Sequence, residues 1–374
     1  MPVRRRALLL LAAGFACGDD LPLEERIASV RPLAMRVEVL DASRAPEDPV
    51  AAEALPLQTV RIVPFFADPD GPMTTDEVAT QLEPLWIACN LQPVQGLFGC
   101  ISDARPLEPE DLVECPPVDP TFDPNMPPVT PSPCRIATDA PGSPEYTIPI
   151  DAAYLIGGDI ELTMVAHAPS ESSTATCLDA LLHEGVDPPP ACVYVTQRIA
   201  VGPDGALVEL AEQFGVPPES LPAVPDPVPD PDRHPHIESV QVVAFDGPGD
   251  DAARIGTFMP AQGEVLQLPW GARLELEIQA PESDLQTYAV TGENGTFPDR
   301  QETYAGRWFR TWGELLGPES DDPLAQNTWT LRKGPQDETE TPDGGVTTLI
   351  YVLRDDRQGV VWTWFHVEVE GGPP

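Results

Sequence analysis

Residues 273–279 read Arg-Leu-Glu-Leu-Glu-Ile-Gln, a strict alternation of polar and apolar side chains. Because successive side chains of a β-strand point to opposite faces of its sheet, this period of two predicts a strand with one buried face. Half-buried strands of this kind are typical of antiparallel sheets. The stretch therefore indicates an antiparallel β-domain in the second half of the chain.

Further strand-like runs lie on both sides of this stretch, at the spacing of the short strands of an all-β sandwich. We expect them at residues 35–39, 59–66, 85–89, 160–166, 192–201, 237–245, 285–291, 307–313, 328–331, 347–354 and 360–369. A short helix is expected at 174–185, and a helical turn or two at 206–214. The pattern predicts an all-β fold with few helices.

Proline divides the chain, because much of its excess falls in two segments. Residues 101–149 show no periodicity and are interpreted as a long loop held by a cross-link. Residues 217–235 alternate Pro with Asp, which predicts an extended, self-repelling spacer. We therefore expect two domains, at 31–216 and 236–374, joined by that spacer.

The charge balance excludes some partners. The chain carries 21 Lys and Arg against 61 Asp and Glu, a formal net charge of -40. A nucleic-acid binder that neutralises phosphates needs the opposite sign, so no nucleic-acid partner is expected. Docking on anionic lipid through a basic surface is disfavoured for the same reason.

The N-terminus predicts export. Three arginines at 4–6 precede an apolar run at 7–16, which as a helix rises about 15 Å and is too short to span a bilayer. Such a segment is typical of a signal peptide, here 1–16. The following Cys17-Gly18-Asp19 resembles a bacterial lipoprotein cleavage site. That resemblance implies a lipid on Cys17, a tether at 17–30 and an extracytoplasmic anchor on the outer membrane; ordinary secretion with cleavage after Ala16 is the alternative.

Cysteine parity favours the lipoprotein interpretation. The chain has seven Cys, and removing Cys17 as a lipid carrier leaves an even number for disulfides in an oxidising compartment. The spacings lack the short paired knuckles of a zinc site. We expect local pairing, and the candidate disulfides are Cys89–Cys100, Cys115–Cys134 and Cys177–Cys192.

The second half also resembles a known module. A Pro-rich start at 232–237, a Gly-containing strand at 268–274 and the Asp-rich, Gly-containing hairpin at 352–359 are similar to bacterial immunoglobulin-like or PKD-like domains. The whole chain resembles lipoproteins of the kind abundant in myxobacteria. The resemblance implies two immunoglobulin-like antiparallel β-sandwich domains and no particular activity.

Enzyme signatures are missing from the sequence. There is no Gly-x-Ser-x-Gly motif, Walker loop or Cys-x-x-Cys motif, and His183-Glu184 lacks the second His of a zinc protease because residue 187 is Asp187. We therefore expect a non-enzymatic protein. A triad assembled from distant residues remains the sequence-level argument for a hydrolase.

Calcium is the one cofactor that the acidic turns suggest, because Ca²⁺ prefers clustered carboxylate oxygens. Asp68 and Asp70 lie in one expected turn, and Asp355 and Asp356 in another. The alternative is that these are solvated acidic loops.

Tryptophan gives the sharpest functional hypothesis. In the last expected strand, Trp362 and Trp364 alternate with a β-branched face that is typical of a core. Together with Trp308 and Trp312 they are a possible ligand face for a glycan or a protein. The alternative is that they pack under a loop or against the first domain. We therefore predict a structural, adhesion or recognition role in the cell envelope, with a carbohydrate-binding module as the alternative.

Overall fold

The structure of the chain is a computed structural model. It describes residues 25–41, 50–91, 112–118, 133–168, 172–183, 189–249, 251–290, 296–317, 319–320, 326–335 and 337–373. Segment 1–16, Cys17 and Cys100 lie outside these residues. The described chain is mostly β, which confirms the expected class, and each expected strand overlaps an observed one.

The first half of the chain forms two sheets. The inner sheet has the order β1 (Arg31–Val39), β3 (Thr59–Asp68) and β4 (Gly71–Pro72), and β7 (Glu145–Thr147) also pairs with β3. The outer sheet has the order β2 (Glu53–Ala54), β9 (Cys192–Val201), β8 (Asp159–His167), β5 (Leu85–Leu91) and β6 (Cys134–Arg135). Val37, Ile62 and Phe66 of the inner sheet pack against Trp86 and Met164 of the outer sheet.

The second half forms two further large sheets. Its inner sheet has the order β12 (Val265–Pro269), β21 (Val360–Glu370), β20 (Val346–Asp355), β16 (Tyr304–Arg310) and β18 (Glu319–Ser320). Its outer sheet has the order β11 (Ala253–Phe258), β10 (Ser239–Asp246), β13 (Arg273–Gln279), β19 (Asn327–Thr330) and β17 (Glu314–Leu315). A two-stranded sheet joins β14 (Thr287–Ala289) to β15 (Asp299–Gln301).

Residues 273–279 form strand β13, and the face that the strand buries is the expected one. Leu274, Leu276 and Ile278 are buried in the second core, where they pack with the Phe365 face of β21. Burial of one face every second residue is what the alternation predicted. Most strand pairs are antiparallel, but β12–β21 and β2–β9 are parallel.

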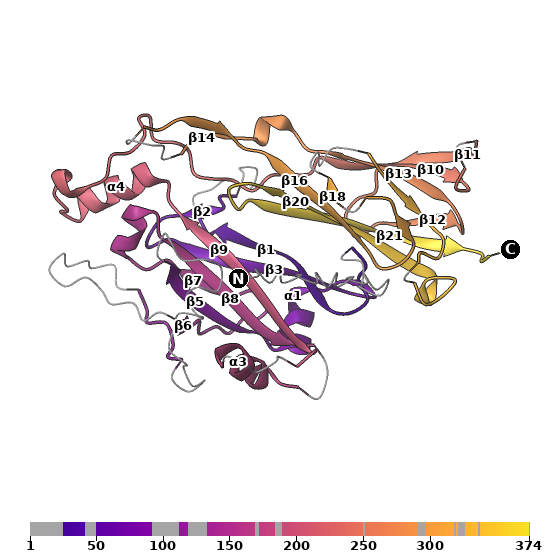
Figure 1. Ribbon diagram of the computed structural model, residues 1–374, viewed down its shortest axis with the longest axis horizontal. Helices are drawn as coiled ribbons and strands as arrows, with labels where there is room; N and C mark the ends of the chain where they lie inside the picture. The colour runs from indigo at the N-terminus through magenta and orange to yellow at the C-terminus, as the bar shows by residue number, and fades with distance from the viewer. Residues whose placement is uncertain are drawn as a thin grey trace, which may run out of the picture.

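The two inner sheets pack on each other, so the four large sheets form a stack (Figure 1). Phe65 and Ala67 of β3 contact Ile350 and Val352 of β20 in a third apolar cluster. Strands β1, β3, β20 and β21 therefore bury both faces, whereas the outer sheets bury one face against a neighbouring sheet.

Helices are short and lie on the outside of this stack. Their bounds are α1 (Thr75–Glu77), η1 (Val78–Leu82), η3 (Ala152–Ile156), α3 (Thr174–Leu182), α4 (Asp204–Gln213), η4 (Pro218–Ser220), η5 (Glu282–Asp284) and η7 (Asp343–Gly345). Helix α3 covers the far face of the outer sheet in the first half, where Leu178 and Leu182 pack on Ile87 and Val165.

Two expectations about Pro-rich segments are wrong. Segment 101–149 was expected to hold no regular element, yet β6 and β7 lie within it and pair with β5 and β3, respectively. Segment 217–235 was expected to be an extended, self-repelling spacer that does not pack. Instead Asp232 is 1% exposed, and its carbonyl accepts a hydrogen bond from Ala52 N at 2.8 Å. Backbone pairing with the first half offsets the poor packing of Pro and Asp.

His234 shows how closely this segment joins the two halves. Its Nε2 lies 2.8 Å from the carbonyl oxygen of Val37 on β1, and its Nδ1 lies 3.1 Å from the backbone N of Val360 on β21. The backbone N–H of Val360 donates, so Nδ1 accepts and Nε2 donates, as in a neutral imidazole. Burial lowers the pKa of His234 to about 4, which is consistent with the neutral form.

Candidate functional site

The predicted tryptophan face is not an exposed ligand face. Trp308 and Trp312 are each 4% exposed and lie in the core of the second half. Trp312 Nε1 donates to the carbonyl of Thr339 at 3.2 Å, which satisfies its polar edge. This prediction is wrong because both rings fill the space between two sheets, where large apolar area is most stabilising.

Trp362 and Trp364 occupy the other face of β21, as the alternation predicted, but there both are partly buried against the first half. Phe65 of the first half stacks on Trp362 at a centroid distance of 4.6 Å and on Trp364 at 5.8 Å. The Arg36 guanidinium lies 4.8 Å from the Trp362 ring centre. The alternative, that these rings pack against the first half, is the arrangement observed.

The calcium candidates cap turns or form ion pairs. Asp68 Oδ1 accepts from the backbone N of Asp70 and of Gly71, and Asp355 Oδ1 accepts from the backbone N of Arg357 and of Gly359. Asp356 pairs with Arg300 at 2.9 Å. Within the described ranges, no group of three or more His, Cys, Asp or Glu side chains is arranged to hold a metal ion.

Two of the expected disulfides are present. Cys115 is bonded to Cys134, and Cys177 is bonded to Cys192. Cys89 is disulfide-bonded as well, while Cys100, its predicted partner, lies outside the described residues. Disulfides form and persist in oxidising compartments, so this chemistry indicates an extracytoplasmic location.

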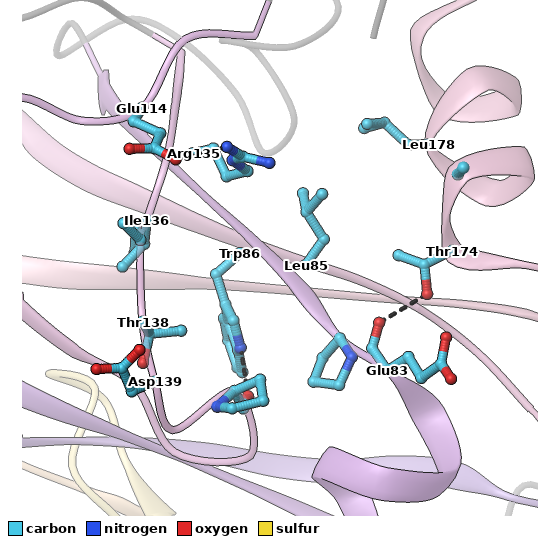
Figure 2. Close-up of a pocket in the computed structure, with 14 residues that line it drawn as sticks. Glu83, Leu85, Trp86, Glu114, Arg135, Ile136, Thr138, Asp139, Thr174 and Leu178 are labelled. Atoms are coloured by element: carbon cyan, nitrogen blue, oxygen red, sulfur yellow. Dashed lines mark hydrogen bonds and ion pairs between the residues drawn. The ribbon is translucent and has the colours of Figure 1, made fainter. Parts of the chain in front are cut away.

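A cavity of about 580 Å³ lies on the outer sheet of the first half, between the start of β5, strand β6 and helix α3 (Figure 2). That volume is within the range of small-ligand sites. Its walls combine apolar side chains with four charged ones, and the lining includes Leu85, Trp86, Ile136, Leu178, Glu83, Glu114, Arg135 and Asp139. No motif in the sequence points to this site.

One wall of the cavity depends on an unusual local backbone. A capping box joins Thr74 and Glu77 at the start of α1, and the chain continues into the π-helix η1. That helix ends at Glu83, which has a φ of 45°. A left-handed conformation in a non-glycine residue is uncommon, and π-helical turns are often associated with functional sites.

Contacts to helix α3 hold Glu83 in place. The Thr174 hydroxyl, on the first turn of α3, donates to the Glu83 carbonyl at 2.7 Å (Figure 2). His167 Nε2 on β8 lies 3.6 Å from Glu83 Oε2. The backbone of Glu83 is therefore fixed, while its side chain is 70% exposed at the cavity rim.

The Cys115–Cys134 disulfide positions the opposite wall. It brings the neighbouring residues together, and Arg135 Nη2 lies 2.7 Å from Glu114 Oε1. Strand β6 then fixes Arg135 beside β5 through the pairing of Ala88 with Cys134. The ion pair between Glu114 and Arg135 follows from the disulfide, because the sequence places one charged residue next to each of its two Cys.

The interior wall is apolar. Trp86 is 1% exposed, and its Nε1 donates to the Pro141 carbonyl at 2.7 Å. Leu85 and Leu178 lie on the opposite face of β5, where they pack in the cluster under α3. A ligand with an apolar body therefore has a surface to cover at the base of the cavity.

The rim is negative. Its charged side chains are Glu83, Glu114, Asp139 and Arg135, three carboxylates against one guanidinium, and that guanidinium is already paired with Glu114. Among the described residues that line the cavity there is no Ser, Cys or His. Its charge and shape suit the binding of a cationic, partly apolar group.

Fold and site together define a class: a mostly β, disulfide-bonded protein with a ligand-sized acidic cavity. No family model matches the chain, and no curated protein matches it. The crystal structure of dimeric latent PorU from Porphyromonas gingivalis aligns with 91% of this chain and 24% of that chain, at 11% identity and a TM-score of 0.20. The chain thus spans about a quarter of that protein's length, and a likeness at this level carries no argument.

In the part of the chain that the structure describes, no helix is both long enough and apolar enough to cross a membrane.

Proposed function

We propose that this chain is an exported, lipid-anchored protein of the bacterial cell envelope that recognises a ligand and does not convert it. In this proposal segment 1–16 is the signal peptide, Cys17 carries the lipid, and 31–216 and 236–374 are immunoglobulin-like β-sandwich units. The two disulfides support export, because bonds of this kind persist outside the cytoplasm.

The acidic cavity carries the recognition part of the proposal. Its lining includes the partly buried Leu85 beneath a rim with excess carboxylate. A Lys- or Arg-containing peptide offers the complementary surface, since its aliphatic stems cover apolar area while the charged heads reach the rim. The ligand class proposed is therefore a cationic, partly apolar peptide segment.

Calorimetric titration with the peptide amide Leu-Lys-Leu-Lys at low ionic strength tests this proposal. Binding is expected, and the Glu-containing counterpart Leu-Glu-Leu-Glu should not bind. Glu83→Gln and Asp139→Asn should each weaken binding up to about fivefold, the size of about 1 kcal/mol for an exposed charge pair. Glu219→Gln, at an exposed site outside the cavity, is the matched control. Equal losses in all three variants would contradict the cavity as the binding site.

Membrane fractionation tests the anchor separately. The full chain expressed in a Gram-negative bacterium should sediment with membranes, and Cys17→Ala should move it to the soluble fraction. Sedimentation of both proteins with the membranes would rule out lipidation of Cys17 as the anchor, whatever the outcome of the peptide titration.

A further inference from the structure

A polar cluster lies where the two halves of the chain meet, next to the apolar contact of the inner sheets. We call it the acid joint, and it consists of Glu53, Asp232, Glu302, Asp355 and Arg357. Arg357 Nη2 lies 3.0 Å from Glu53 Oε2, and Arg357 Nη1 lies 3.0 Å from Glu302 Oε1. Glu53 belongs to β2 in the first half, whereas Glu302, Asp355 and Arg357 belong to the second half. The joint thus places one guanidinium among four carboxylates.

Three of the four carboxylates in the acid joint accept hydrogen bonds from backbone N–H groups. Glu53 Oε2 accepts from the backbone N of Asp232 at 3.0 Å, and Glu302 Oε2 accepts from the backbone N of Gln286 at 2.7 Å. Asp355 Oδ1 accepts from two backbone N–H groups in the turn between β20 and β21. These contacts stabilise the charged form of each group.

Asp232 is the exception. The residue is 1% exposed, and neither carboxylate oxygen accepts a hydrogen bond from any described residue. Its backbone is held on both sides, by Glu53 Oε2 at the N–H and by Ala52 N at the carbonyl. The side chain is therefore held inside the joint, where an ionised carboxylate without a donor is strongly disfavoured.

We propose that Asp232 is a proton-binding site, that the two halves dock with this carboxyl protonated, and that its ionisation loosens the acid joint as the pH rises. The uncharged carboxyl removes one of four negative charges from a cluster that holds one guanidinium. Ionisation restores that charge inside the contact, beside Asp355 and Glu302.

The surrounding charges agree with this geometry. Burial, followed by the Asp355 carboxylate, raises the pKa of Asp232 to about 8, and Arg357 opposes the shift while Glu302 and Glu53 add to it. Burial also raises the pKa of Asp355 to about 6. His234 stays neutral across this range, since burial lowers its pKa to about 4.

The sign of the pH effect follows from linkage. A carboxyl whose pKa is raised by folding binds its proton more tightly in the folded state. Its contribution to stability is complete below the ordinary pKa of 3.8 and is lost as the pH rises through about 8. Docking is therefore expected to weaken as the pH rises from 4 to 8. Lowering the pH within that range should strengthen it.

A bound cation is the competing explanation for a buried carboxylate without a donor. All five residues of the acid joint are described, and no group of three or more acidic, His or Cys side chains among the described residues is arranged for a metal. A proton requires no such arrangement. The geometry thus favours protonation, and calcium becomes a control in the experiment.

Thermal unfolding of the full mature chain between pH 5 and pH 9 tests the proposal. Asp232→Asn keeps the shape of the protonated carboxyl and does not titrate, so it should raise the Tm at pH 8–9 by at least about 2 °C and raise it by less at pH 5. The matched control Asp230→Asn removes an exposed carboxylate two residues away and should follow the wild-type protein.

Three outcomes would overturn the proposal. The first is a Tm of Asp232→Asn that lies below the wild-type Tm at pH 8, or that differs from it by the same amount at every pH. The second is failure of Asp232→Asn to fold, because a neutral mimic of the protonated group must be tolerated. The third is a rise in the wild-type Tm with millimolar calcium over chelator that Asp232→Asn abolishes, which would assign the site to a cation.

Discussion

The contact between the two halves has two parts built on different chemistry. The apolar part includes Phe65, Ile350, Val352, Trp362 and Trp364, whereas the acid joint holds four carboxylates and Arg357. Apolar burial is non-directional and independent of pH. A buried ionic cluster depends on every partner and on its protonation state.

This difference suggests a division of roles. Stacked rings and aliphatic side chains supply the attraction that holds the inner sheets together. The acid joint contributes little net attraction when all its carboxylates are ionised, because one guanidinium cannot balance four of them. It instead makes the contact specific and responsive to pH. Variants in the two parts should therefore differ in how much free energy of unfolding they lose and in how that loss depends on pH.

The largest effect is expected from Phe65→Ala in the apolar part. Phe65 is 3% exposed and stacks on both Trp362 and Trp364. Removing a buried Phe side chain costs about 3–5 kcal/mol through lost burial and the cavity left behind. Urea unfolding followed by tryptophan fluorescence should show this loss at pH 5 and pH 8 alike.

Leu316→Ala is the control for that variant, since Leu316 is 75% exposed. An exposed apolar truncation should change the free energy of unfolding by less than about 0.5 kcal/mol. A Phe65→Ala protein as stable as the control would show that the inner sheets do not depend on the aromatic stack.

Arg357→Met should have the next largest effect, and its size should depend on pH. The change leaves Glu53 and Glu302 without their guanidinium in a contact where both side chains are largely buried. Breaking a buried ion pair from one side costs about 3 kcal/mol at the lower end of its range. We expect that loss at pH 8 and a smaller loss at pH 5, because burial raises the pKa of Asp232 to about 8 and of Asp355 to about 6, so both neighbours of Arg357 hold protons at pH 5.

Arg300→Met provides the comparison, because Arg300 pairs with Asp356 at the surface and its side chain is 57% exposed. Its loss should cost less than about 1 kcal/mol at either pH. If both variants lose the same stability with no pH dependence, the acid joint behaves as an ordinary surface ion pair.

The strands were predictable because burial of one face leaves a period of two, as at Leu274, Leu276 and Ile278. Strand β11 lacks this signal, since most of its residues are exposed. The stacking of inner sheets was not predictable. The alternation placed Trp362 on the correct face, but an aromatic face has the same pattern whether it binds a ligand or packs on a second sheet.

Site prediction was limited for a similar reason. The pairing of Cys115 with Cys134 was predicted from their local spacing. That disulfide also brings the flanking Glu114 and Arg135 together. Glu83 reaches the cavity through a π-helical turn that tertiary packing selects, and no propensity signals that turn. Asp232 falls in the Pro–Asp segment that was expected to be an extended, self-repelling spacer, and its contact with β2 shows that this end of the segment packs.

The smallest effect concerns Arg36, which borders the apolar part. Its guanidinium lies 4.8 Å from the Trp362 ring centre, and its side chain is 28% exposed. A partly exposed cation–π contact contributes about 0.5–1 kcal/mol, so Arg36→Gln should cost that much in urea unfolding, and Arg36→Lys somewhat less. Arg61→Gln on the neighbouring strand removes an exposed pair with Glu145 and serves as the control. If Arg36→Gln and Arg61→Gln lose equal stability, Arg36 acts only as a surface charge. The rings of Phe65, Trp362 and Trp364 then hold this part of the contact without it.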